Sequence, residues 1–147
     1  MQIATRTTNN LFQEIKILLE SARNQVVKAV NSAMVLTYFE VGKIIVKHEQ
    51  KGREKAQYGA EILKDLSKNL TKEFGKGFSI TNLQQMRSFY LAYQKQQTVS
   101  AKFILSWSHY IFLIRMDEEE RSFYEIETTQ NNWSVRELER QLENDIS

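Results

Sequence analysis

The sequence of residues 70–90 is LTKEFGKGFSITNLQQMRSFY, and it predicts the end of one helix and the start of another. An apolar row that begins at residue 62 ends near Leu70, and Gly75 can adopt the left-handed backbone that terminates a helix. Ser79 is a favoured cap for the next helix, because its hydroxyl can accept a hydrogen bond from an amide of the first turn. A helix, a glycine-containing turn and a capped second helix have the outline of a helix-turn-helix.

The chain on both sides of this corner also has helical periodicity. Apolar residues recur at steps of three and four over residues 11–50, which predicts one long helix or two helices with a bend near Asn31 and Ser32. Gly42 in this stretch suggests that another helix packs closely there, because glycine otherwise costs a helix about 1 kcal/mol relative to alanine. After a polar loop at residues 51–55, helices are predicted at 61–74, 80–96, 103–116, 118–129 and 135–147, with Asp117 and Ser134 as caps.

We therefore expect an all-α fold, with one helical domain of about five to six helices at residues 11–147 that contains a helix-turn-helix-like unit. A disordered or frayed segment is expected at residues 1–10. The chain has no cysteine, which excludes disulfides and thiolate chemistry. No apolar run approaches the ~18 residues of a membrane span, so a soluble cytoplasmic protein without membrane contact is expected. The last helix is still amphipathic where the sequence stops, as in a segment cut from a longer protein.

Charge is unevenly distributed along the chain. Residues 43–115 contain thirteen lysines and arginines and five acidic residues, whereas residues 116–147 contain three and ten. A basic middle region is typical of nucleic-acid contact. The alternative interpretation is that the acidic C-terminal segment packs against the basic region and neutralises it.

The helix that begins after Ser79 has one polar side without a carboxylate, and this side is the candidate for contact with bases. Glutamine can form two hydrogen bonds with adenine in the major groove, and threonine or serine can bond many base edges. Lysines at steps of four on the preceding helix would neutralise phosphates. Such rows are also common on ordinary solvated faces. The predicted DNA-binding residues are Lys64, Lys68, Lys72, Lys76, Thr81, Gln84, Gln85, Ser88 and Lys95.

No catalytic, metal or cofactor site is predicted. Ser108 and His109 are adjacent and so do not face each other on a helix, and His48 has no metal-ligand partner at a suitable spacing. The acidic run at residues 117–120 favours a helix start. The aromatic residues are expected mostly in the core.

Several motifs in this order resemble the N-terminal domain of the YhcG family. They are the stretch at residues 70–90, LSWSHYIFLIRM at 105–116 and WSVRELERQL at 133–142, together with Asn31, Tyr38, Gly42, Tyr58, Gly59, Leu66, Ser67, Arg121 and Tyr124. The resemblance covers residues 11–142. It implies a second, C-terminal domain in full-length relatives that looks like a metal-dependent PD-(D/E)XK nuclease. The residues of that nuclease are not in this sequence, so the chain is expected to be an isolated N-terminal domain or a naturally short relative, without enzyme activity of its own.

The resemblance also bears on three side chains. Arg87 is expected to pair with an acid such as Glu137, and Trp107 and His109 are expected to be a buried aromatic and a hydrogen-bonded histidine. The predicted function is a DNA-binding or targeting domain of a nuclease, with DNA as partner. The alternative is a protein-interaction or dimerisation module, in which the long N-terminal helix pairs with its copy to form a homodimer.

Overall fold

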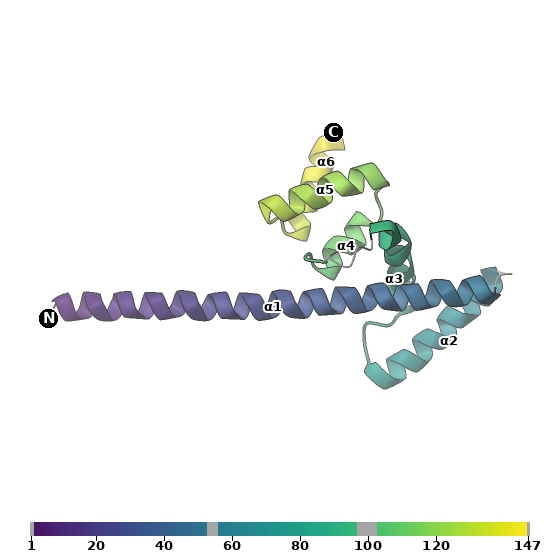
Figure 1. Cartoon of the computed structure of the whole chain (residues 1–147), viewed down its shortest axis with the longest axis horizontal. Helices are drawn as coiled ribbons and strands as arrows, with labels where there is room; N and C mark the ends of the chain where they lie inside the picture. The colour runs from purple at the N-terminus through teal and green to yellow at the C-terminus, as the bar shows by residue number, and fades with distance from the viewer. Residues whose placement is uncertain (1, 53–55, 97–102, 147) are drawn as a thin grey trace.

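The computed structural model describes residues 2–52, 56–96 and 103–146, and this part of the chain is all-α (Figure 1). It contains six α-helices and one 3₁₀-helix and no strand, as expected from the periodicity. The elements are α1 (Gln2–Gly52), α2 (Ala56–Phe74), α3 (Ile80–Tyr93), η1 (Gln94–Gln96), α4 (Trp107–Leu113), α5 (Glu118–Asn131) and α6 (Val135–Ile146).

Helix α1 is one continuous helix of 51 residues without a break at Asn31 and Ser32. Residues 2–10 belong to it, which differs from the expected frayed segment, and so do Lys51 and Gly52 of the expected loop. Residues 53–55 of that loop lie outside the described residues. In Figure 1 the N-terminal half of α1 extends well beyond the other helices, which pack along its C-terminal half.

Helix α3 crosses α1 at Gly42, as the glycine predicted. A Cβ added at Gly42 would lie 2.8 Å from the backbone carbonyl carbon of Met86 and would also overlap its oxygen, so only glycine permits this approach. The crossing buries Phe39 of α1 against Phe89 of α3, with ring centroids 5.8 Å apart. Close packing of this kind makes the crossing the centre of the core.

Two groups of buried residues share this crossing. One joins α1 and α3 to α4, α5 and α6, and it consists of Val35, Phe39, Phe89, Tyr93, Tyr110, Leu113, Met116, Tyr124 and Leu138. The other joins α1, α2 and α3 through Ile45, Leu63, Leu83 and Met86. Helix α3 therefore takes part in both groups, and in Figure 1 α2 lies on one side of α1 while α4, α5 and α6 lie on the other.

Several other helix boundaries also differ from those predicted. Helix α2 begins at Ala56 instead of residue 61, and α3 ends at Tyr93 and continues as η1. Helix α4 is only seven residues long, because Ser106 has extended backbone angles (φ −78°, ψ 162°) and caps it there. Asp117 caps α5 as expected, with its carboxylate accepting a 2.9 Å hydrogen bond from the Glu120 amide.

Helix α1 is also long and apolar enough to cross a membrane by length and composition. Its most apolar window of 18 residues has a mean hydropathy of 1.3, although 28% of that window is buried inside the protein. The core helix of a soluble protein can meet the same condition. The C-terminal half of α1 packs against α3 and contributes Val35 and Phe39 to the core.

Candidate nucleic-acid interface

The corner between α2 and α3 is fixed by backbone geometry and by side chains on both sides of the turn. Gly75 and Gly77 have positive φ angles of 82° and 111°, which favour glycine. The Ser79 hydroxyl caps α3 by accepting a 3.0 Å hydrogen bond from the Asn82 amide. The Ser67 hydroxyl of α2 donates a 2.7 Å hydrogen bond to the Phe78 carbonyl, so α2 holds the turn directly.

Asn82 links this corner to α4. Its side-chain amide donates a 2.5 Å hydrogen bond to the Gly77 carbonyl, and its carbonyl oxygen accepts a 3.0 Å hydrogen bond from the Trp107 indole. Trp107 is half-buried, and its ring packs 5.2 Å from that of Phe89. The expected buried aromatic at Trp107 is therefore only half-buried, and the Asn82 side chain forms hydrogen bonds that position the turn.

Helix α3 has one buried side and one exposed side, as its periodicity predicted, although Phe89 is buried where Tyr90 was expected and Tyr90 is half-buried. Leu83, Met86, Phe89 and Tyr93 are buried. On the other side Thr81, Gln84 and Ser88 are exposed and Gln85 is half-buried. Residues 78–95 contain no carboxylate, so no acidic side chain of α3 itself opposes a phosphate.

Arg87 does not contribute a free charge to this surface. Its Nε lies 2.9 and 2.8 Å from the two carboxylate oxygens of Glu49 on α1. The expected pairing with Glu137 is therefore wrong, since Glu137 instead pairs with Arg140 in its own helix. The Arg87–Glu49 pair joins α3 to α1 beside the crossing.

The five predicted lysines are all exposed, but their surroundings differ. Lys64, Lys68 and Lys72 share α2 with Glu61, Asp65 and Glu73, which are exposed as well, so the charge of this helix sums to zero. Lys76 lies in the turn before α3, and Lys95 lies in η1 directly after it. The ion pairs within 4.0 Å among the described residues, Lys16–Glu20, Arg87–Glu49 and Arg140–Glu137, include none of these lysines.

The acidic C-terminal helices do not cover the exposed side of α3. They pack through α4 and reach only the C-terminal end of α3, on its buried side (Figure 1). There the buried Arg121 donates hydrogen bonds to the carbonyls of Met116 (3.1 Å) and Ala92 (3.2 Å). The polar face of α3 therefore remains open, which is the arrangement that contact with a polyanion needs.

One polar contact at this junction was not found from the sequence. The Tyr93 hydroxyl donates a 2.6 Å hydrogen bond to Glu125 of α5. Burial raises the pKa of the Glu125 carboxyl above its ordinary value, although the hydrogen bond from Tyr93 and the Arg121 charge oppose this change. Burial and the nearby Glu125 charge also raise the pKa of Tyr93.

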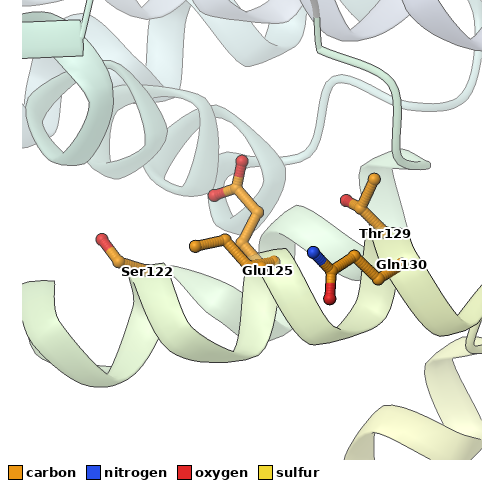
Figure 2. A pocket seen from close by; sticks show the side chains of 5 residues that line it. Ser122, Glu125, Thr129 and Gln130 are labelled. Atoms are coloured by element: carbon orange, nitrogen blue, oxygen red, sulfur yellow. The ribbon is translucent and has the colours of Figure 1, made fainter.

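A pocket of about 380 Å³ opens beside this contact and is lined by Ser122, Glu125, Ile126, Thr129 and Gln130 of α5. Figure 2 shows the Glu125 side chain pointing away from the α5 ribbon in this pocket. The pocket holds no group of three or more metal-ligating side chains, and none occurs elsewhere among the described residues. Its hydroxyl, amide and carboxyl groups do not form a nucleophile–base pair.

His109 has a structural environment. Its Nδ1 lies 2.7 Å from the Ser106 hydroxyl and its Nε2 lies 2.8 Å from the Trp133 carbonyl oxygen. Because a carbonyl only accepts, Nε2 carries the proton and Nδ1 accepts from Ser106. The ring closes the capping box of α4 and ties it to the α5–α6 connection, so the expected hydrogen-bonded histidine is present.

Comparison with known proteins agrees with this architecture. The family model described as the DUF1016 N-terminal domain matches residues 14–146. The chain is 40% identical over 156 residues to a protein of Escherichia coli (strain K12) named "Putative nuclease YhcG", in an alignment that covers 85% of this chain and 42% of that relative. The chain thus spans less than half the length of this relative. No solved structure matches this chain. These matches confirm the resemblance seen in the motifs, and the chain belongs to the YhcG family, of which it represents the DUF1016 N-terminal domain.

Proposed function

We propose that this domain binds DNA and directs a nuclease to it, without cleaving DNA itself. The observation that carries the proposal is the exposed polar side of α3, which contains Thr81, Gln84 and Ser88 and no carboxylate. A helix of this kind fits the major groove, where glutamine pairs with adenine and hydroxyls bond several base edges. The name of the Escherichia coli relative supports an association with a nuclease.

The corner supports the proposal through its rigidity. Two positive-φ glycines, the Ser79 cap and the Asn82 hydrogen bonds hold α3 at a fixed angle to α2. A recognition helix held in this way loses little conformational entropy on binding. In this arrangement Lys76 and Lys95 contact phosphates at the two ends of α3.

The lysines of α2 have a smaller role in this proposal. Lys68 and Lys72 are partly compensated by the acidic residues of the same helix, so their attraction to phosphate is screened more than that of Lys76 and Lys95. We therefore expect the phosphate contacts of the turn and of η1 to dominate binding. Lys64 lies farthest along α2 from the corner.

The test is fluorescence anisotropy of labelled duplex DNA across a salt series. A double substitution of Lys76→Glu and Lys95→Glu is expected to weaken binding at all sequences and to reduce the dependence on salt by about one unit of slope for each lost contact. The matched control is Lys16→Glu with Lys28→Glu on the N-terminal half of α1, which changes the net charge equally. Lys68→Glu with Lys72→Glu should give an intermediate loss.

Two results would contradict the proposal. If the Lys16 and Lys28 control weakens binding as much as the Lys76 and Lys95 variant, the attraction is general and not local to α3. If the unchanged chain does not retain duplex DNA at low salt, the domain does not bind DNA. Cleavage of DNA by the purified chain with Mg²⁺ would contradict its non-catalytic role.

A further inference from the structure

The N-terminal half of α1 is an arm that extends beyond the other helices (Figure 1). All side chains of residues 4–30 are exposed, and the segment is about 40 Å long at 1.5 Å per residue. Leu11, Ile15, Leu18 and Val26 are 56%, 47%, 68% and 62% exposed. They belong to an apolar stripe that consists of Leu11, Ile15, Leu18, Ala22, Val26, Ala29 and Ala33.

This stripe is comparable in size to the largest apolar patch on a typical monomer. A strip 40 Å long on a helix about 10 Å wide has a projected area of about 400 Å². That area falls within the size of the largest apolar patch of a typical monomer, which often has a function. Phe12, Leu19 and Val30 lie along one edge and are also more than half exposed, which widens the patch further.

The protein's own helices cannot cover the stripe. The residues of α1 that face the core are Val35, Phe39, Gly42 and Val46. At 3.6 residues per turn they lie about 130° around the helix from the stripe. Beyond the stripe, the same side of α1 continues through Leu36, Glu40, Ile44 and Lys47, which are all exposed, so this side stays open along the whole helix.

We infer that the arm forms a homodimer by pairing antiparallel with the arm of a second copy, centred on Ala22. The stripe positions are symmetric about residue 22, with successive steps of 4, 3, 4, 4, 3 and 4. A two-fold axis at Ala22 therefore places every stripe residue opposite another stripe residue. The interface is isologous and closed, as in most soluble homodimers.

The volumes of the facing side chains match in this register. Leu11 packs against Ala33 of the partner subunit, Ile15 against Ala29 of the partner subunit, and Leu18 against Val26 of the partner subunit. A large residue thus faces a small one at the two outer levels, Leu18 faces Val26 at the inner level, and Ala22 lies opposite its own copy at the centre. A parallel pair would place Leu11 against its own copy at one end and Ala33 against its own copy at the other, so the spacing would be uneven.

The edges of the stripe favour the same direction. Antiparallel helices bring like edges together, so the apolar edge with Phe12, Leu19 and Val30 meets its own copy. The polar edge has Glu14, Gln25 and Ser32. In the pair, Glu14 lies level with polar neutral residues of the partner subunit and not with a second carboxylate. The alternative occupant of the apolar stripe is a membrane surface, since amphipathic helices also bind there.

In this pairing, the helices that pack on α1 in one copy do not collide with those of the other copy. The helices that pack on the C-terminal half of α1 lie on its other side, so the two copies carry them outward at opposite ends of the paired rod. The two crossings at Gly42 are then about 60 Å apart along the rod, from 40 residues at 1.5 Å each. The dimer does not depend on DNA, so it can be tested separately from the proposed function.

The first test is the mass of the full chain by light scattering after size exclusion, at micromolar concentration and without DNA. The unchanged chain is expected at twice its mass of 17.3 kDa. Leu18→Glu is expected to raise the dissociation constant by roughly 100-fold or more, because each copy would bury an unpaired carboxylate. Ile17→Glu is the matched control, since Ile17 is adjacent and 65% exposed but lies off the stripe. A monomeric unchanged chain, or equal weakening by both variants, would overturn the inference.

The second test fixes the direction of the pair, using the absence of native cysteine. Under oxidation Ala22→Cys is expected to form a disulfide-linked dimer, whereas Leu11→Cys alone is not. Mixing Leu11→Cys with Ala33→Cys should give a linked dimer of the two variants. Linkage of Leu11→Cys with itself would show a parallel pair and overturn the proposed register.

The third test addresses the membrane alternative with vesicles of phosphatidylcholine and phosphatidylglycerol. The dimer is expected to remain in the supernatant on sedimentation. If the chain instead binds the vesicles and Leu18→Glu prevents this, the arm contacts lipid and the inference is wrong.

Discussion

The crossing of α1 and α3 at Gly42 gives the sharpest test of the fold. A Cβ in Gly42→Ala would lie 2.8 Å from the Met86 carbonyl carbon, closer still to its oxygen, and 3.0 Å from the Tyr90 Cβ. The obstacle is the backbone of α3, which cannot rotate away as a flexible side chain would. The two helices must therefore separate, which loosens the packing of Phe39 against Phe89.

The expected cost follows from two opposing effects. Forcing one extra methyl into a packed site costs about 1–3 kcal/mol, and a backbone obstacle belongs at the upper end. Alanine in place of glycine stabilises a helix by about 1 kcal/mol, which offsets part of that cost. The net destabilisation is about 2 kcal/mol. For a domain of this size it lowers the melting temperature by about 6 °C.

Thermal unfolding followed by tryptophan fluorescence measures this change where it occurs. Trp107 packs on Phe89 with ring centroids 5.2 Å apart, and the second tryptophan, Trp133, packs against the same core cluster, so the emission reports the core instead of the exposed arm. Gly59→Ala is the matched control. Gly59 is also helical, but an added Cβ there meets no heavy atom within 4 Å, so this variant should gain up to about 1 kcal/mol.

The reasoning would be refuted if Gly42→Ala melted at the same temperature as the unchanged chain or above it. An equal change in melting temperature for Gly42→Ala and Gly59→Ala would also refute it, since the two sites would then not differ in packing. In either case α3 would have to cross α1 elsewhere or at a greater distance.

Three further changes test contacts that join the helices. Arg87→Ala should cost at most about 1 kcal/mol in urea unfolding, because its pair with Glu49 is partly exposed, and a double-mutant cycle with Glu49→Ala should show the coupling. Asn82→Leu should cost about 2 kcal/mol, because it leaves a turn carbonyl and an indole N–H without partners; a neutral result would mean that water replaces both bonds. Glu125→Gln should raise the melting temperature at pH 7, and should raise it less near pH 4. Burial raises the pKa of the Glu125 carboxyl from 4.5, so its ionisation removes stability as the pH rises. The introduced glutamine cannot ionise, and its amide oxygen can still accept the hydrogen bond from Tyr93. A larger gain at low pH would contradict the assigned sign.

The parts of the fold that the sequence predicted depend on neighbours within four residues. Ser79 and Asp117 cap helices because their side chains reach amides three residues ahead. Gly75 ends α2 by its own backbone conformation. The buried side of α3 follows from its periodicity, which also identified the exposed polar side that forms the candidate site.

The contacts that were missed join residues far apart in the sequence. Arg87 lies 38 residues from Glu49, and Tyr93 lies 32 residues from Glu125, so no local pattern identifies either partner. The short α4 was missed because residues 103–106 have an apolar pattern that suits a helix, yet they pack as an irregular segment in which the Tyr110 hydroxyl accepts a hydrogen bond from the Leu105 amide. Tertiary packing decided this boundary against helical propensity.

The N-terminal and C-terminal halves of α1 are stabilised in different ways, which leads to a last prediction. The C-terminal half is held by α3, whereas the side chains of residues 4–30 are all exposed, and a helix in isolation is marginal in water. If the arms pair, amide hydrogen exchange over residues 11–33 should slow as the protein concentration rises, because association stabilises the paired state by mass action. Leu18→Glu should remove this protection while amides near Phe39 and Val46 keep theirs, since α3 covers them in each copy. Slow exchange of the arm that is independent of concentration and of Leu18→Glu would mean that the helix is stable alone, and its apolar stripe would then need another explanation.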